Sequence, residues 1–257
     1  MAGPTAFRII HVSETGSTNA DAMRLALEGE ELPLWVIADQ QTAGRGRAGR
    51  AWVSPQGNLY TSVAFCCSAS MEKAGQLSLI AGISLFEAIR ATTDLALYVG
   101  LRLKWPNDIL MGAAKMGGIL VESTSARGNP GFLAIIGFGL NIRSAPDDLG
   151  RAVTALGRHA EAPAPDVLMA ALADQTQHWL ELWNSGENFA AIRHAWMERA
   201  GALGEPITVN LTDGPVSGSY RGLSETGALL AEIDGVVREI NHGDVALGVA
   251  SADDGDA

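Results

Sequence analysis

Three arginines and three glycines lie within seven consecutive residues, Gly44-Arg45-Gly46-Arg47-Ala48-Gly49-Arg50. The chain as a whole is acidic, with a formal net charge of −11 and only 18 lysines and arginines in 257 residues, so this segment concentrates positive charge. Glycine lets the backbone approach a bound group closely, and arginine offers a fork of donors that suits phosphate or carboxylate. The segment therefore predicts a flexible loop that closes over an anion.

Other interpretations of this segment follow from its residues. Its glycines match the GxGxxG spacing of a dinucleotide-binding turn, but Pro55 and Gly57 follow where that turn requires a helix. A solvated turn or a short RNA-contacting tract would also contain such residues. The acidic balance of the chain and the lack of interleaved aromatic residues argue against RNA. No GxxxxGKS/T sequence occurs, so a P-loop is excluded.

A second candidate group consists of Lys104-Trp105-Pro106-Asn107-Asp108 and the nearby Lys115. Asp108 and Lys115 flank a short turn at residues 111–114, with strand-like residues on both sides. A hairpin would direct both side chains into one site. There a carboxylate can accept a proton or hold Mg²⁺, and an ammonium can pair with a carboxylate or a phosphate. The alternative is a turn-forming aspartate next to a solvated lysine.

A third candidate, Gly137-Phe138-Gly139-Leu140-Asn141, ends an apolar strand. Glycines at such a position indicate that a ligand or a helix approaches the backbone closely, and Asn141 could donate to a ligand. A plain strand end would have the same sequence. The five histidines are scattered without the spacing of a zinc site, so no protein-held metal is predicted.

The elements that must position these residues are strands and helices in alternation. Helices are expected from residues 17–21 to a stop at Gly29, where Ser17 or Thr18 could cap the first turn, and at residues 76–91. Residues 147–204 are expected to be mostly helical, most clearly at 168–183 and 189–200. Strands are expected at residues 7–12, 34–38, 58–67, 98–103, 118–122 and 132–142.

The pattern changes after residue 203. Short strands are expected at residues 206–211, 216–223, 228–233 and 236–240, and Asp-Gly and Thr-Gly turns separate them. We therefore expect a first domain at residues 1–203, an all-β module at residues 204–250 and an acidic, disordered tail at residues 251–257.

The composition is that of an ordinary soluble globular protein, with 47% hydrophobic and 18% charged residues. No apolar run is long enough to span a membrane, and the first residues lack the basic and apolar regions of a secretory signal. The two cysteines, Cys66 and Cys67, are adjacent and cannot form an ordinary bridge with each other. These features predict a reduced, cytoplasmic protein without membrane contacts.

Taken together and in order, these motifs resemble those of the biotin protein ligases, the biotin–[acetyl-CoA-carboxylase] ligases. The resemblance covers about residues 8–250, and its most specific parts are the arginine–glycine segment and the Lys-Trp-Pro-Asn-Asp sequence. It implies an α+β fold, in which a mixed β-sheet is flanked by helices as in class II synthetases and is followed by a small C-terminal SH3-like β-barrel. The matching segments are Ser17–Asn19, Gln41–Arg50, Trp52, Ser54-Pro55, Gly57–Tyr60, Lys104–Asp108, Lys115–Glu122 and Gly137–Asn141.

The resemblance also implies an activity. Members of this family activate biotin with ATP to biotinyl-5′-AMP, release pyrophosphate, and transfer biotin to a lysine of a carrier domain. The expected ligands are therefore ATP, substrate-bound Mg²⁺ and biotin, and the expected partner is the biotin carboxyl carrier domain of a carboxylase. A lipoate–protein ligase is the alternative enzyme, and a catalytically silent biotin or nucleotide sensor is the alternative binding protein.

Some members of the family carry a DNA-binding domain before the catalytic domain. Here the motifs begin within about ten residues of Met1, which predicts a monofunctional ligase with no nucleic-acid partner. The acidic net charge agrees with that expectation. The resemblance allows either a monomer or a homodimer.

Single residues receive roles from the resemblance. Lys115, Arg47 and Asp108 are expected to be catalytic: Lys115 stabilises charge at the α-phosphate, and Arg47 closes over the intermediate. Asp108 helps to deprotonate the incoming lysine amine or, alternatively, binds the metal or the nucleotide. Biotin is expected to contact Ser17, Thr18, Asn19, Gln41, Arg45, Gly46, Arg47, Lys115 and Gly117. The nucleotide is expected to contact Arg45, Arg47, Arg50, Trp52, Asn58, Asn107, Lys115 and Asn141.

Overall fold

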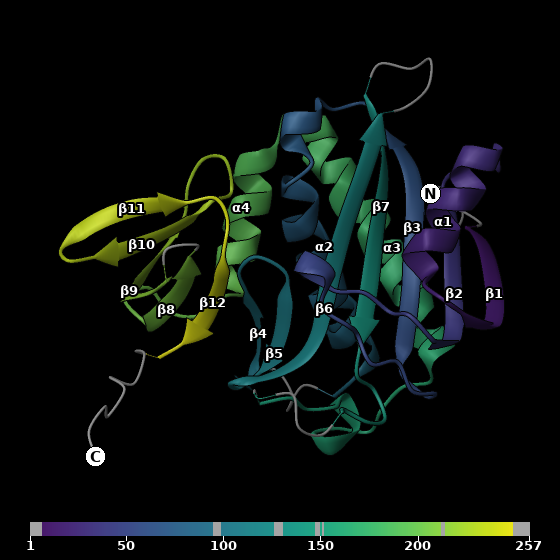
Figure 1. Ribbon diagram of the computed structural model, residues 1–257, viewed down its shortest axis with the longest axis horizontal. Coiled ribbons are helices and arrows are strands. Elements are labelled where there is room, and N and C mark those ends of the chain that lie inside the picture. Colours follow the sequence, from purple (N-terminus) through teal and green to yellow (C-terminus); the bar gives the residue numbers. More distant parts are fainter. Residues whose placement is uncertain are drawn as a thin grey trace.

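Two β-sheets organise the structure, a computed structural model that describes residues 7–94, 99–125, 131–146, 150, 152–211 and 214–248 (Figure 1). The larger sheet has seven strands in the order β1-β2-β3-β7-β6-β5-β4, and the smaller has five in the order β11-β10-β9-β8-β12. β1 pairs with β2 in parallel, whereas the other neighbouring strands pair antiparallel. The predicted mixed sheet with a separate C-terminal β module is therefore confirmed.

The elements have the following bounds. The larger sheet contains β1 (Arg8–Thr15), β2 (Leu34–Gln41), β3 (Leu59–Cys67), β4 (Leu101–Lys104), β5 (Asp108–Met111), β6 (Ala114–Ser125) and β7 (Phe132–Leu140). The smaller sheet contains β8 (Pro206–Leu211), β9 (Gly214–Leu223), β10 (Leu229–Ile233), β11 (Val236–Ile240) and β12 (Asp244–Leu247). The α-helices are α1 (Thr18–Glu28), α2 (Gln76–Thr92), α3 (Pro165–Trp183) and α4 (Phe189–Glu198), and the 3₁₀ turns are η1 (Arg47–Gly49), η2 (Met71–Lys73), η4 (Leu156–Arg158) and η5 (Asn184–Gly186).

Helices cover both faces of the larger sheet (Figure 1). α1 packs on β2 and β3 on one face, whereas α2 and α3 pack together behind the other face. Successive side chains of a strand point to opposite faces, so β2 contributes to both cores. Trp35 belongs to the large apolar cluster that includes α2 and α3, and the next residue, Val36, belongs to the smaller cluster beneath α1. This arrangement fixes the first turn of α1 over the middle of the sheet.

α1 begins and ends where its sequence predicts. Ser17 is the extended residue before the first turn, and its side chain makes no capping hydrogen bond, so the alternative that the Ser17 side chain caps this helix is wrong. Gly29 ends the helix in the left-handed conformation at φ 95°, and its N–H donates to Ala26 O at 3.3 Å. Glycine adopts this conformation without the steric penalty of a side chain, which explains the stop.

The smaller sheet packs beside α4 and the β4–β5 hairpin (Figure 1). Its buried side chains belong to the same apolar cluster as the core of the larger sheet. Polar contacts also join the two parts: Trp105 Nε1 donates to Gly227 O at 3.1 Å, and Arg102 pairs with Glu205 at 2.7 Å. The C-terminal module is thus packed against one edge of the larger sheet, next to the Lys-Trp-Pro-Asn-Asp sequence.

The structure differs from the expected elements in several places. β5 is not among the expected strand ranges, β1 continues to Thr15, and β6 runs from Ala114 to Ser125 rather than over 118–122. β12 is not among the expected strands; it is only four residues long and pairs with β8. β2 continues beyond residue 38 to Gln41. β4 begins at Leu101, while residue 98 of the expected strand and the tail 251–257 lie outside the described residues. Within the described part of the chain, no helix is long and apolar enough to cross a membrane.

Candidate active site

A cavity that is partly open to solvent lies over β6 and β7 of the larger sheet. It is bounded by the first turn of α1 and by residues 44–52, which we call the arginine loop. The structure therefore brings the three sequence motifs together at one place. The lining residues are Ser17, Thr18, Asn19, Gln41, Arg45, Gly46, Arg47, Arg50, Ala51, Trp52, Asn107, Lys115, Gly118, Ile119, Leu120, Gly137, Phe138 and Gly139.

One end of the cavity is neutral, buried and internally hydrogen-bonded. Thr18 donates from its backbone nitrogen at 2.9 Å and from its hydroxyl at 3.1 Å to Gln41 Oε1. Gln41 Nε2 in turn donates to Ser54 Oγ at 3.1 Å. These bonds fix the Gln41 amide because its oxygen accepts and its nitrogen donates. A ligand at this end meets amide and hydroxyl groups in fixed orientations.

Asn19 belongs to the same neutral wall and depends on two further residues. Ser62 Oγ, fully buried on β3, lies 2.6 Å from Asn19 Oδ1 and 2.7 Å from Thr18 Oγ1. Gly137 on β7 leaves the space that the Asn19 amide occupies, because a Cβ at this position would overlap that amide. The glycine that the sequence suggested for close approach therefore accommodates a side chain of the first turn of α1.

The arginine loop folds back on itself. Gly46 N donates to Arg50 O at 2.7 Å, and Trp52 N donates to Gly44 O at 2.8 Å. Gly44 fits only without a side chain, since a Cβ would come within 2.5 Å of Trp52 O and 2.8 Å of Ser54 Oγ. This fold places the arginines of the loop at the cavity and its rim. No α-helix follows the loop before β3, unlike in a dinucleotide-binding turn.

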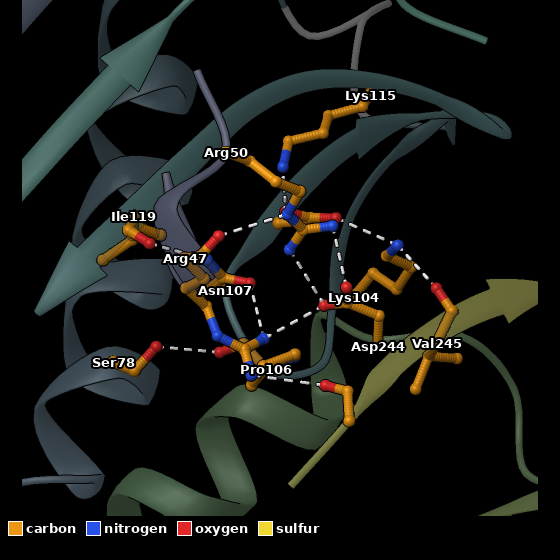
Figure 2. Close-up of polar contacts among 12 residues, drawn as sticks. Arg47, Arg50, Ser78, Lys104, Pro106, Asn107, Lys115, Ile119, Asp244 and Val245 are labelled. Carbon is orange, nitrogen blue, oxygen red and sulfur yellow. Dashed lines mark hydrogen bonds and ion pairs between the residues drawn. The ribbon is translucent and has the colours of Figure 1, made fainter. Parts of the chain in front are cut away.

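Carboxylates from distant parts of the chain hold these arginines. Asp244 on β12 pairs with Arg47 at 3.3 Å and with Arg50 at 2.7 Å. Arg47 also donates to Asn107 Oδ1 and to Gly243 O, each at 3.3 Å. Figure 2 shows Arg47 and Arg50 converging on Asp244 from the loop. The C-terminal module thus contacts the candidate site directly through β12.

Asp108 lies between two lysines beside the same loop. Its carboxylate pairs with Lys115 Nζ and, at 2.9 Å, with Lys104 Nζ. Lys104 also donates to Val245 O at 2.6 Å (Figure 2). Burial raises the pKa of Asp108, but the ammonium groups of Lys115 and Lys104 outweigh burial and hold that pKa below its ordinary value of 3.8. Asp108 is therefore an anion that fixes the Lys115 ammonium at the cavity, and it is a weak base.

Trp52 forms a flat apolar side of the cavity. Lys115 Nζ lies 5.5 Å from the centre of its ring, and Gly139 leaves room for the ring because a Cβ there would overlap it. Among the described residues, the buried Trp52 Nε1 has no hydrogen-bond partner. This N–H lies in the plane of the ring beside Gly139, so a planar ligand in the cavity would meet the face of the indole and not this donor.

Most of the predicted site residues line this cavity, and four do not. Asp108 touches it only through Lys115. Gly117 lies next to the lining residue Gly118, and its missing side chain accommodates Gly139 O and Leu140. Asn58 Oδ1 accepts from the backbone nitrogens of residues 142, 143 and 144, and Asn141 Nδ2 donates to Thr154 O. Both asparagines therefore hold backbone next to the site.

Three residues of the site are not among the predicted ones. Ser62 supports Thr18 and Asn19, Glu122 pairs with Arg45 at 3.1 Å, and Asp244 holds the other two loop arginines. Alternation along β3 places Ser62 on the face of α1, which is the available sequence signal for it. In the described residues, no group of three His, Cys, Asp or Glu side chains could hold a metal ion.

Comparisons with known proteins agree with this geometry. Residues 12–141 match the model of the biotin/lipoate A/B protein ligase family, and residues 202–248 match the biotin protein ligase C terminal domain. The chain is 36% identical to the biotin–[acetyl-CoA-carboxylase] ligase of Paracoccus denitrificans, covering 85% of this chain and 92% of that protein.

Two further relatives define the extent of the similarity. The bifunctional ligase/repressor BirA of Escherichia coli is 32% identical over 82% of this chain, which spans 65% of BirA. The biotin protein ligase of Aquifex aeolicus in complex with biotin and ATP superimposes with a TM-score of 0.76 at 26% identity, covering 95% of this chain and 99% of that one. The chain therefore belongs to the biotin protein ligases.

Proposed function

We propose that this protein activates biotin with ATP to biotinyl-5′-AMP and then transfers biotin to a lysine of a carboxylase's biotin carboxyl carrier domain. One observation carries the proposal: a single cavity joins a neutral, hydrogen-bonded wall to a cluster of lysine and arginine side chains. Biotin has the same polarity, with a neutral ureido ring at one end and a carboxylate at the other. The relatives named as biotin ligases support the same activity.

The first step joins two anions, the biotin carboxylate and the α-phosphate of ATP. Two unit charges 4 Å apart repel by about 4 kcal/mol at an effective dielectric constant of 20. Lys115 is positioned to offset this repulsion because Asp108 holds its ammonium at the cavity. Arg45 and Arg47 line the same side, where they would bind phosphate oxygens and exclude water from the mixed anhydride.

The neutral wall would bind the ureido ring through Thr18, Asn19 and Gln41. The adenine would stack on the face of Trp52, and Asn107 lies at the phosphate side next to Arg47. Mg²⁺ enters as part of the MgATP substrate. Lysine near its ordinary pKa of about 10.4 is almost fully protonated at neutral pH, so the carrier lysine must lose a proton before it attacks.

The same residues suggest a refined role for Asp108. Its two ion pairs disfavour proton transfer from the carrier lysine, and they favour positioning of Lys115. We further propose that residues 1–203 form the catalytic domain and that residues 204–250 form a module that completes the rim through Asp244. A cytoplasmic location and the absence of a nucleic-acid partner agree with the unpaired cysteines and the net charge of −11. Either a monomer or a homodimer would suit this site, because one chain supplies the lining described.

The test is pyrophosphate release from MgATP with biotin, lipoate or no acid, followed by mass spectrometry of an added carrier domain. We expect release with biotin and a gain of one biotinyl group on one carrier lysine. Release with lipoate alone would assign the chain to lipoate ligation instead. Binding of biotin without any pyrophosphate release would make the chain a sensor, and the proposal would be wrong.

A further inference from the structure

Glu122 on β6 joins the two ends of the candidate site, although no part of the proposed chemistry uses it. Its Oε2 accepts from Asn19 Nδ2 at 2.7 Å, and its two oxygens accept from Arg45 Nη2 at 3.1 and 3.2 Å. Asn19 belongs to the neutral wall and Arg45 to the arginine loop. One carboxylate therefore contacts both parts that must act on the same ligand.

The contact to Asn19 sets the direction of its amide. The Asn19 nitrogen donates to Glu122 and to Leu120 O, while its oxygen faces Ser62. An amide can present its oxygen or its nitrogen with nearly the same shape, so the neighbouring acceptors decide which one a ligand meets. Glu122 is the charged acceptor in this set, and it favours the orientation in which the amide nitrogen points away from Ser62.

The contact to Arg45 leaves the guanidinium able to bind a ligand. Both hydrogen bonds to Glu122 use Nη2, and a guanidinium has five N–H donors in a fixed plane. Arg45 lines the cavity, whereas Glu122 does not. The carboxylate can thus hold the guanidinium from outside the cavity while other N–H groups face an anion within it.

The solvent exposure of the Arg45–Glu122 ion pair argues against a mainly structural role for it. The side chains of Arg45 and Glu122 are 47% and 31% exposed. Ion pairs with such exposure contribute little to folding because water and salt screen them. The pair is nevertheless placed where it ties the first part of the arginine loop to the sheet, just as Asp244 ties the later part to β12.

We propose that Glu122 is a positioning residue that couples the arginine loop to the biotin-binding wall. It orients the Asn19 amide toward the neutral ring, and it holds Arg45 at the mouth of the cavity so that the loop retains the adenylate. This inference rests on the proposed function for the identity of the ligand. The juxtaposition itself, one carboxylate between Asn19 and Arg45, is independent of it.

The test compares Glu122→Gln with the matched control Glu28→Gln. Glu28 is a 56% exposed carboxylate on α1 that pairs with Arg24 at 2.9 Å, and it lines the same open surface groove as Arg45 and Glu122. We expect Glu122→Gln to raise the biotin KM and the release rate of biotinyl-5′-AMP by about tenfold each. The kcat for pyrophosphate release should change less than threefold, and Glu28→Gln should behave as wild type in every measurement.

Two readouts separate positioning from stability. Because the Arg45–Glu122 contact is exposed, the effect of Glu122→Gln should shrink as ionic strength rises, while the melting temperature stays at that of wild type. In an Arg45→Ala background, Glu122→Gln should add no further increase in adenylate release, since the loop contact is already lost. Equal behaviour of Glu122→Gln and Glu28→Gln, or fully additive effects with Arg45→Ala, would overturn the inference.

Failure of the proposed function would give a different result. If wild type released no pyrophosphate with biotin, the ligase proposal would be wrong, and calorimetric titration with biotin alone would still compare Glu122→Gln with Glu28→Gln. Weaker binding of biotin to Glu122→Gln only would support the positioning of Asn19, and equal binding would refute it.

Discussion

The neutral wall and the arginine loop bound the same cavity but are built by different physical means. Ser17, Thr18 and Asn19 are 7%, 4% and 3% exposed, and the wall they begin is a chain of neutral hydrogen bonds. Arg45 and Arg50 have side chains that are 47% and 46% exposed, and carboxylates on β6 and β12 hold them. Burial and mostly neutral hydrogen bonds hold the wall, whereas screened ion pairs hold the arginine side chains of the loop.

This difference explains how one site can be selective and still open. A buried neutral wall rejects a ligand that leaves its amides unpaired, because each unpaired group costs about 1–3 kcal/mol. Ion pairs at the rim cost little to exchange, so phosphate oxygens can replace the carboxylate partners of the arginines when substrate binds. Changes in the wall should therefore alter ligand binding, and changes in the loop should alter retention of the intermediate.

Removal of the half-buried Lys115, which lies between the two regions, should have the largest effect. Lys115→Ala takes away the ammonium that offsets the repulsion between carboxylate and α-phosphate, while Asp108 keeps Lys104 as a partner. Loss of one such group typically lowers a rate by about 10²–10³-fold. Single-turnover pyrophosphate release would measure this loss, and a change below about tenfold would remove Lys115 from the chemistry.

The neutral wall should bind biotin more weakly when the space that Gly137 leaves for the Asn19 amide is filled. Gly137→Ala places a methyl group where the Asn19 amide lies, and overpacking of a tight site costs about 1–3 kcal/mol. We expect that cost mainly as weaker biotin binding by calorimetry. Gly75→Ala is the matched control because a Cβ there meets nothing within 4 Å. Normal binding by Gly137→Ala would show that the wall is more deformable than its packing indicates.

The loop should fail in a different way. Arg47→Gly removes contacts to Asn107, Gly243 and Asp244, but Arg50 still pairs with Asp244. The Arg47 side chain is 30% exposed, so solvent already screens its contacts and their removal should have a moderate effect. We expect biotinyl-5′-AMP to escape about tenfold faster at low salt. Biotin binding alone should change little. An unchanged escape rate, measured by trapping free adenylate, would contradict the view of the loop as a clamp.

The sequence predicts the elements that form the two regions better than it predicts the partners of the loop arginines, and the reason is physical. Local patterns are sufficient for the start and stop of α1, for the strands around the cavity and for the Asp108–Lys115 hairpin, because each depends on residues close in the chain. The partners of the loop arginines are not local: Glu122 lies 77 residues from Arg45, and Asp244 lies 197 from Arg47. Their identity depends on how sheets pack, which periodicity does not encode.

A short strand and two asparagines are further features whose roles the sequence alone does not predict. β12 has only four residues, yet it carries Asp244 to the loop. Asn58 and Asn141 are predicted to contact the nucleotide, and in the structure their side chains also bond the backbone beside the site. An asparagine near a site can serve either purpose with the same local sequence, so its role is decided only when its neighbours in space are known.

Asp108 sharpens the comparison because it is charged like the loop yet buried like the wall. Its pKa is lowered by Lys115 and Lys104 despite burial, so its ionised form stabilises the folded state. This contribution is fully present above its ordinary pKa of 3.8 and is lost as pH falls through the lower folded value. The free energy of unfolding of wild type should therefore fall more steeply below pH 3.8 than that of Asp108→Asn.

This acid effect should be the smallest of the four, since it is confined to a window outside the neutral range. Urea unfolding at intervals from about pH 7 to about pH 2 would measure it in both proteins. The stability curves should converge at low pH, because a protonated Asp108 and the amide of the Asp108→Asn variant both lack the charge that pairs with the lysines. Parallel curves would mean that the ion pairs of Asp108 serve only to position Lys115 and do not stabilise the fold.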